Sequence, residues 1–396
     1  MERGGRQRSW LYLGIFILAA VAAGAAIWIA SQMAMQNVQQ GDNSTFIPSK
    51  STVTPNLTTD VVLGGRDHVW DIAFLPTKEM IFTERKGTVS LFKDGAMREL
   101  MQISDVYARG EGGLMGLAVD SKFNENHFIY TCFNSSKGAP DVRVVRWRLS
   151  DDASRLEERK DIIIGMPSNK SGRHSGCQLE FGPDGFLWVG TGDSAQNSHS
   201  QNPKSLGGKI LRVDRDGNAA SGNQGGQFDD RIYSYGHRNT QGLAFFAQAK
   251  ADALGVSVEH GSTVDDEVNL LKTGNFGWAP PASYNESGVP MTDKKRFPDA
   301  VEAIWSSGSP TQAPSSAAFL KGRHWKAWDG TLAIAMLKGQ HLKILQLDNN
   351  ANVTKEEKVL TTFGRLRAVT QGPDGNLYIS TDNGSGNDQI IRVAAS

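Results

Sequence analysis

A pattern that recurs six times between residue 60 and the C-terminus constrains the fold more than any other feature of this chain. Each instance is a weak strand, a turn, a strong apolar strand with a small or polar end, and a further strand. The instances begin at Ile72, Leu117, Leu179, Leu243, Ala317 and Ala368. Four-stranded sheets repeated radially around an axis form a β-propeller. We therefore expect one all-β domain over residues 59–396, a six-bladed β-propeller, with a two-sheet sandwich as the alternative.

The last repeat offers only one more strand-like segment, Gln389–Val393, before the chain stops. A strand at Thr59–Leu63 can complete that final sheet and close the ring. The 43 glycines suit a fold with many turns. Lys+Arg and Asp+Glu each total 42, and this balance argues against a nucleic-acid partner, which normally leaves a basic footprint.

Residues 1–58 do not share the repeat. Residues 10–30 are 21 uncharged, mostly apolar residues behind the basic segment 1–9, and this length can span a bilayer as a helix. The next lysine or arginine is Lys50, so the positive-inside rule keeps the basic segment in the cytoplasm. We expect a single-pass transmembrane anchor in the inner membrane, a flexible linker over the polar residues 31–58, and a propeller on the periplasmic side. A cleaved signal peptide is the alternative.

The two cysteines, Cys132 and Cys177, lie in or beside apolar strand-like segments. An exported compartment permits a disulfide between them. Two buried free thiols are the alternative, and the spacing does not match a metal-binding pattern.

A histidine and an aspartate stand at the two ends of one predicted hairpin, Ser171–Asp193. His174 opens its first apolar segment, Gly182–Gly185 forms the turn, and Asp193 closes its second apolar segment. A Pro-Asp-Gly turn between β-rich segments predicts antiparallel strands, so we expect the two side chains to be neighbours. A carboxylate beside an imidazole fixes its tautomer and stabilises the imidazolium, as a general base requires. The alternative is a structural contact at the edge of a blade.

Basic residues are expected to join this pair, because corresponding strand ends of a propeller meet at one mouth of its channel. Arg365 and Arg367 stand two positions apart, and the side chains of an extended chain repeat every second residue, so both point to the same side. With Lys338 they form a cationic cage suited to a di- or tricarboxylate, since a guanidinium binds a carboxylate through paired hydrogen bonds. Acid, base and cation at one mouth indicate a ligand site.

Nine separated segments, in order, resemble the pyrroloquinoline quinone (PQQ)-dependent sugar dehydrogenases, the group of the soluble glucose, aldose sugar and sorbosone dehydrogenases. The resemblance covers roughly residues 59–395. The segments are HSGCQLEFGPDG, GTGD, LGGKILRVD, GHRNTQGLAF, EHG with DDEVN, GNFGW, PTQAPSS, LKG, and GRLR with PDGNLYISTD. Each of them alone is weak, whereas nine in order are specific.

The resemblance implies a role for each matching residue. His174 matches the base that removes the proton from the anomeric hydroxyl as hydride leaves C1 for the quinone. Asp193 matches the carboxylate that orients it, and Arg238 matches the cation that stabilises the developing oxyanion. Asn239 resembles a cofactor-binding residue, with a blade-closing asparagine as the alternative. The residues that match the grip on the cofactor carboxylates are Thr311, Lys338, Arg365 and Arg367.

The resemblance also implies Ca²⁺, which binds carbonyl and carboxylate oxygens and would act as a Lewis acid on the quinone. Gly261 and Ser262 occupy the turn whose carbonyls hold the ion, although the family commonly has proline at the second position. Asp266 and Glu267 either bind a second, structural Ca²⁺ or cap a turn.

Two departures from the family concern the sugar. Glu111 stands where the family usually has glutamine, and a carboxylate only accepts hydrogen bonds. Arg173 precedes the base where the glucose enzyme has an acid, and Thr240 replaces a proline. We expect Glu111 and Arg173 to contact substrate, and glucose specificity does not carry over.

We therefore expect a PQQ- and Ca²⁺-dependent dehydrogenase that oxidises an aldose at C1 to its lactone. A quinone or a cytochrome would accept its electrons. The alternatives are a Ca²⁺-dependent hydrolase of the lactonase kind and a non-catalytic propeller that binds a protein or glycan. The basic residues at the mouth disfavour the hydrolase, which would need a metal held mainly by carboxylate and amide side chains. Binding alone does not require the full set of matching residues, which disfavours the non-catalytic propeller; the set is His174, Asp193, Arg238, Lys338, Arg365 and Arg367.

Overall fold

The computed structural model describes residues 51–396. The predicted basic segment and anchor, and all but the end of the predicted linker, lie outside the described residues. No helix within residues 51–396 has the length and apolarity needed to span a membrane.

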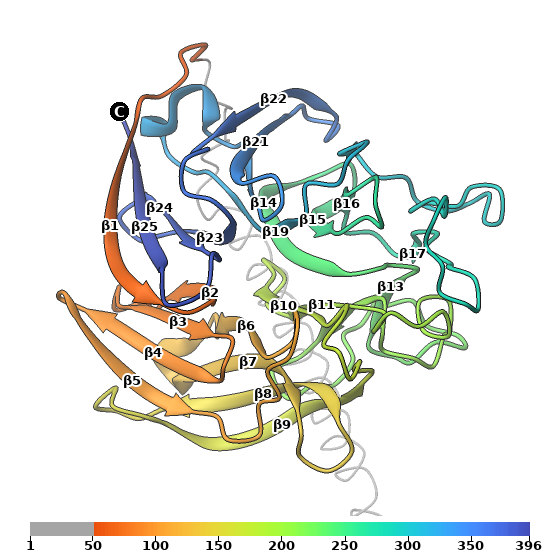
Figure 1. The fold of residues 1–396 in the computed structure, drawn as a ribbon, viewed down its shortest axis with the longest axis horizontal. Coiled ribbons are helices and arrows are strands. Elements are labelled where there is room, and N and C mark those ends of the chain that lie inside the picture. The colour runs from red at the N-terminus through yellow and green to blue at the C-terminus, as the bar shows by residue number, and fades with distance from the viewer. Residues whose placement is uncertain (1–50) are drawn as a thin grey trace, which may run out of the picture. The chain divides into compact units, whose positions relative to one another are not determined.

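Six sheets are arranged around a central axis, as Figure 1 shows, and the predicted six-bladed propeller is confirmed. Sheets one to three are each built from consecutive antiparallel strands, with a short parallel strand, β17, added to the third. Their elements are β2 (Val69–Phe74), β3 (Met80–Glu84), β4 (Thr88–Lys93) and β5 (Ala96–Gln102); β6 (Leu114–Val119), α2 (Phe123–Asn126), β7 (Phe128–Ser135), β8 (Asp141–Leu149) and β9 (Leu156–Met166); and β10 (Gly176–Phe181), β11 (Leu187–Thr191), β12 (Lys209–Val213), β13 (Ile232–Tyr235) and β17 (Gly274–Asn275).

Sheets four to six complete the ring. Their elements are β14 (Thr240–Lys250), β15 (Ala253–Glu259), β16 (Glu267–Leu270) and β18 (Trp305–Ser306); β19 (Pro314–Phe319), η1 (Arg323–Trp328), β20 (Leu332–Met336), β21 (His341–Leu347) and β22 (Val353–Val359); and β23 (Leu366–Gln371), β24 (Leu377–Thr381), β25 (Asp388–Ala395) and β1 (Leu57–Arg66).

The sixth sheet joins the two ends of the domain. β1 pairs antiparallel with β25, with Leu57 opposite Ala395, and Figure 1 shows the two strands side by side. The strand expected at Thr59–Leu63 lies inside β1. The first strand of the domain therefore supplies the outermost strand of the last blade.

Apolar side chains fill the space between neighbouring blades. Residues 51–396 hold six clusters of buried apolar side chains, one at each junction between adjacent sheets. A middle strand such as β11, LWVGT, is buried along its whole length, because a neighbouring blade covers each of its faces. This packing explains why the second strand of each repeat reads as a continuous apolar segment rather than as an alternating one.

A disulfide joins the second and third blades. Cys132 in β7 and Cys177 in β10 are bonded, with their Cα atoms 5.6 Å apart. Of the two alternatives left open by the sequence, the structure has the disulfide. It anchors the beginning of β10, three residues after His174.

Strand direction decides where the polar strand ends gather. The middle and C-terminal parts of the six innermost strands line one cavity of about 660 Å³ in the channel. Their N-terminal ends therefore meet at the other mouth. The second strand of each blade runs antiparallel to the first, so its C-terminal end reaches that same mouth. Most of the residues expected to form the site precede innermost strands or follow second strands, and Arg367 lies at the start of the innermost strand β23.

Candidate active site

His174 and Asp193, expected to be neighbours, are in hydrogen-bond contact. His174 lies two residues before β10, and Asp193 lies two residues after β11. The distance from His174 Nδ1 to Asp193 Oδ1 is 2.8 Å. The two residues are 4% and 0% exposed. Within residues 51–396 no group bonds His174 Nε2, so that nitrogen is available to a ligand.

Both oxygens of Asp193 accept further hydrogen bonds. Oδ1 also accepts from the Ala195 amide at 2.8 Å. Oδ2 accepts from Trp278 Nε1 at 2.8 Å and from the hydroxyl of Tyr284. These donors replace the water that a fully buried carboxylate has lost.

The backbone around His174 is unusually constrained. His174 has φ = 53°, in the left-handed region that few non-glycine residues occupy. Its carbonyl accepts from the Ser194 amide at 3.1 Å. A Cβ atom on Gly192 would lie only 2.0 Å from that carbonyl oxygen. The second glycine of GTGD is therefore required for the two strand ends to approach closely enough for the His174–Asp193 contact.

Glu111, expected to contact substrate, lies beneath the loop that carries His174. Its carboxylate accepts from the amides of His174 and Ser175, each at 3.2 Å. It also accepts from Asn239 Nδ2 at 3.1 Å and Gln241 Nε2 at 2.8 Å. Burial alone would raise the pKa of Glu111, but the charges of His174 and His260 and the bond from Asn239 together hold it below its usual value. The carboxylate therefore links three blades.

Asn239, expected to bind the cofactor, is fully buried one residue before β14. Its Nδ2 bonds Glu111, and its Oδ1 accepts from the Gly176 amide at 3.0 Å and from Gln241 Nε2 at 3.2 Å. The amide is thus occupied by protein groups, as the blade-closing alternative requires.

Arg238 lies beside the histidine pair but bonds other groups. Its carbonyl accepts from the Asp193 amide at 2.9 Å. Its Nε donates to Glu286 at 2.6 Å, and its Nη1 donates to the His260 carbonyl at 3.0 Å. Arg173, expected to face substrate, donates to the same Glu286 carboxylate, and its side chain is 49% exposed. Glu286 therefore bridges the two guanidinium groups.

Arg365 and Arg367 converge as expected, and both bond Asp382. Their Nη2 atoms lie 3.3 Å and 2.9 Å from Asp382 Oδ2. Arg367 also lies over the ring of Trp70, with Cζ 3.7 Å from the ring centroid. Arg367 Nε and Nη1 are buried and have no hydrogen-bond partner among the described residues. Two orphaned donors on a buried guanidinium are suited to the carboxylates of an anionic cofactor such as PQQ.

A histidine that the sequence analysis missed, His68, completes this network. Its Nδ1 lies 2.5 Å from Asp382 Oδ1. Burial alone would raise the pKa of Asp382, but Arg367 and His68 outweigh burial and hold the pKa well below its usual value. The arginine pair therefore faces an ionised carboxylate of the protein itself.

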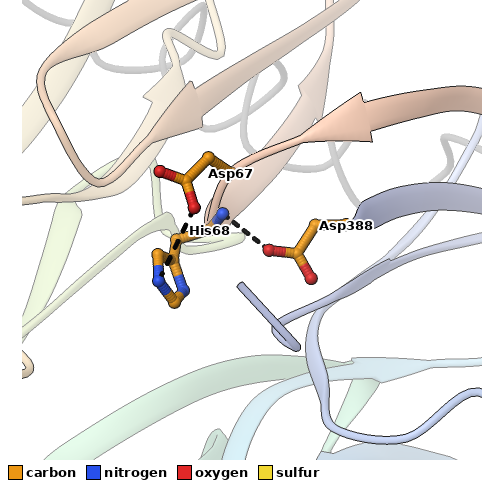
Figure 2. Close-up of side chains that lie close together, drawn as sticks. All are labelled: Asp67, His68 and Asp388. Atoms are coloured by element: carbon orange, nitrogen blue, oxygen red, sulfur yellow. Dashed lines mark hydrogen bonds and ion pairs between the residues drawn. The ribbon is translucent and has the colours of Figure 1, made fainter. Parts of the chain in front are cut away.

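Figure 2 shows His68 between Asp67 and Asp388, a grouping close enough to suggest a metal site. The His68 contact with Asp388 is a bond from the backbone amide, 2.8 Å long. Asp388 also accepts from the Thr381 hydroxyl and from the amides of Asn383 and Gly384. Its oxygens cap the loop before β25, and these hydrogen bonds account for the grouping without a metal ion.

Thr311 and Lys338 form a second pair at the same mouth. Thr311 lies three residues before β19, Lys338 lies two residues after β20, and Lys338 Nζ is 3.3 Å from Thr311 Oγ1. Lys338 is exposed, so its ammonium group can reach a ligand.

The expected Ca²⁺ turn has carbonyl groups available. Among the described residues, no hydrogen bond is donated to the carbonyls of Gly261 or Ser262. Asp266 caps this turn by accepting from the Gly261 amide at 3.0 Å and from the amides of Gln312 and Ala313. Carbonyl oxygens are ligands that Ca²⁺ prefers, so the turn fits the ion.

The structure does not bring Asp266 and Glu267 together. Adjacent residues point to opposite sides of an extended chain, and Glu267 instead contacts Asn269 and Thr292. Burial and the neighbouring Glu259 raise the pKa of Glu267 to about 8. The turn-capping alternative therefore describes Asp266, and the two carboxylates do not form a shared Ca²⁺ site.

Besides His68, four residues of the site were not singled out as site residues. Trp278 ends the GNFGW segment and Asp382 follows a strong strand, so both carried a signal. Tyr284 and Glu286 come from the loop between β17 and β18, which has no periodicity to read.

Comparisons with known proteins agree with this geometry. A family model described as Glucose / Sorbosone dehydrogenase matches residues 66–392. The aldose sugar dehydrogenase YliI of Escherichia coli is 31% identical over 343 residues, which cover 83% of this chain and 90% of that protein. Quinoprotein glucose dehydrogenase B of Acinetobacter calcoaceticus is 26% identical over 464 residues, 94% of each chain.

Solved structures give the same result. The PQQ-bound aldose sugar dehydrogenase of Streptomyces coelicolor is 29% identical with a TM-score of 0.72, and the match covers 87% of this chain and 100% of that one. The apo form of the soluble aldose sugar dehydrogenase of Escherichia coli is 28% identical with a TM-score of 0.77, covering 86% and 100%. The match to the family model, which spans most of the propeller, shows that this chain belongs to the glucose/sorbosone dehydrogenase family.

Proposed function

We propose that this protein is a PQQ- and Ca²⁺-dependent oxidoreductase that oxidises an aldose at C1 to its lactone. The observation that carries the proposal is a buried imidazole with one nitrogen held by Asp193 and the other free, at the mouth where the basic residues gather. When bound, PQQ would supply a quinone able to accept hydride, and Ca²⁺ would supply Lewis-acid polarisation of a quinone carbonyl. A PQQ-bound family member from Streptomyces coelicolor supports the choice of cofactor.

The residues of this chain would divide the work as follows. Asp193 holds the Nδ1 proton of His174, so Nε2 of His174 keeps its lone pair and can take the proton of the anomeric hydroxyl. The rest of the side chain is buried, so the imidazole is held in place while Nε2 stays open to substrate. Arg238, held at the same mouth, supplies positive charge for the developing oxyanion.

The cofactor carboxylates would be held by the arginine pair and by Lys338. Arg367 has two orphaned donor nitrogens, Nε and Nη1, which a carboxylate would satisfy. Arg365 and Lys338 are more exposed and add charge at the rim. The carbonyls of Gly261 and Ser262 would bind Ca²⁺.

The test is reconstitution of the full chain with PQQ and Ca²⁺. We expect saturable PQQ binding and aldose-dependent reduction of an artificial electron-accepting dye over a panel of aldoses. Absence of PQQ binding refutes the proposal. Hydrolysis of lactones without dye reduction would favour a hydrolase, and PQQ binding without any sugar oxidation would favour a non-catalytic propeller.

We further propose that the propeller acts outside the cytoplasm, anchored by residues 10–30, and passes electrons to a membrane quinone or a cytochrome. The Cys132–Cys177 disulfide supports an exported location, because disulfides persist in oxidising compartments. Fractionation of cells that express the full chain tests this. Recovery of the protein with both thiols reduced in the soluble cytoplasmic fraction contradicts it.

A further inference from the structure

Tyr284 places its hydroxyl group against both members of the histidine pair. The hydroxyl lies 3.0 Å from His174 Nδ1 and 2.5 Å from Asp193 Oδ2. The two rings are also in contact, with centroids 5.9 Å apart. Tyr284 belongs to the loop between β17 and β18, so this contact comes from a segment 110 residues beyond His174.

The position of each proton in this group follows from the number of donors. Burial and the nearby charge of Asp193 raise the pKa of Tyr284 well above its usual value, so the phenol keeps its proton. The Nδ1 proton of His174 is donated to Asp193 Oδ1, so Nδ1 cannot accept the phenol proton. The phenol therefore donates to Asp193 Oδ2, and its oxygen faces the N–H of His174.

We propose that Tyr284 is a positioning residue for His174, which acts by donating a hydrogen bond to Asp193. A carboxylate that shares its charge with a phenol attracts a proton on the imidazole less strongly. The bond also fixes the carboxylate plane, and with it the direction of Nε2. This proposal rests on the proposed function of His174 as the base.

Other charged groups also face His174 from the elements packed around it. Glu111 accepts from its amide, Arg173 adjoins it, and Arg238 lies beside Asp193. Arg173 lies over the Tyr284 ring, 5.6 Å from its centroid, and Glu286 joins Arg173 to Arg238. None of these groups bonds the Tyr284 hydroxyl, so removing that hydroxyl leaves their charges in place.

Tyr284→Phe keeps the ring and removes the hydroxyl group, which donates to Asp193 and lies 3.0 Å from His174 Nδ1. Asp193 then attracts a proton on the imidazole more strongly, so the acidic limb of the kcat/KM profile moves to higher pH. We expect kcat at neutral pH to fall about tenfold, a fraction of what a general base supplies, with KM changed less than about threefold.

Tyr378→Phe is the matched control, because Tyr378 also donates to an aspartate, Asp374, in the sixth blade. Thermal unfolding shows whether each variant folds. A ¹⁵N-histidine NMR titration of the protein without PQQ reports the tautomer and pKa of His174, with His174→Ala identifying its signals. Substitution of Tyr284 by 3,5-difluorotyrosine, a stronger donor, should lower the pKa of His174 instead.

We expect the NMR titration to show a higher pKa of His174 in Tyr284→Phe and a lower one with difluorotyrosine. Tyr378→Phe should leave the measured value unchanged. A His174 pKa that does not move in folded Tyr284→Phe overturns the proposal, as does an equal shift in Tyr378→Phe. If the wild-type protein binds no PQQ, the proposed function fails, whereas the NMR titration still decides whether Tyr284 controls His174.

Discussion

Glu111→Gln tests whether this side chain supports the site or contacts sugar. Four N–H groups point at the Glu111 carboxylate, from His174, Ser175, Asn239 and Gln241. Glutamine keeps one oxygen and places an NH₂ group where the other stood. Both carboxylate oxygens accept hydrogen bonds from N–H groups. In either orientation of the glutamine amide, some of these N–H groups therefore face the new NH₂ group and lose their acceptor.

The size of the effect follows from this count. Each buried donor that loses its acceptor costs about 1–3 kcal/mol, and Glu111 is only partly buried, so we expect a total of about 2–3 kcal/mol. Unfolding entropy of about 2.1 cal/mol/K per residue gives about 0.7 kcal/mol/K for roughly 340 residues. The melting temperature should therefore fall by about 3–4 °C.

The pH dependence has a definite sign. The pKa of Glu111 is lower in the folded protein, so its carboxylate stabilises the fold above the usual glutamate pKa of about 4.3. That contribution is lost as the pH falls through the folded-state pKa. Thermal unfolding should be measured at pH 7 and at pH 4 and below. The difference in melting temperature between wild type and Glu111→Gln should become smaller on acidification. Equal melting temperatures at pH 7, with KM for sugars changed, would refute the supporting role.

Two further predictions concern stability and the cofactor. Cys132→Ser with Cys177→Ser opens a loop with a sequence separation of 45, and should lower the free energy of unfolding by up to about 4 kcal/mol in urea; an unchanged midpoint would contradict this. Arg367→Ala should weaken PQQ binding at least about tenfold in a fluorescence titration, because a hydrogen bond to a charged group contributes about 1.5–3 kcal/mol. Arg392→Ala, which removes a more exposed guanidinium from the sixth blade, is the control, and equal affinities for the two variants would argue against the cationic cage.

The sequence was sufficient to predict the ring and its closure. Each repeat carries its own turn and apolar strand, so the blades could be counted locally, and β1 was expected because the last repeat lacked a strand. The His174–Asp193 contact was also local, since one hairpin joins both residues. Arg365 and Arg367 could be paired because strand side chains alternate.

The contacts that the sequence did not indicate involve partners that are distant in sequence. A carboxylate on a loop suits a sugar hydroxyl as well as backbone amides, and the Asn239 and Gln241 amides that bond Glu111 lie 128 and 130 residues away. The loop of Tyr284 and Glu286 has no pattern that indicates its contacts. By contrast, the separation of Asp266 from Glu267 is local, because adjacent side chains of an extended chain point to opposite sides.

The central claim is that His174 accepts the sugar proton during hydride transfer to bound PQQ. Stopped-flow absorbance of the PQQ-loaded full chain, mixed with aldose in a single turnover, measures this step directly. We expect His174→Ala to bind PQQ with nearly wild-type affinity and to be reduced about 10²–10⁴ times more slowly. Reduction of the loaded variant at the wild-type rate would contradict the account.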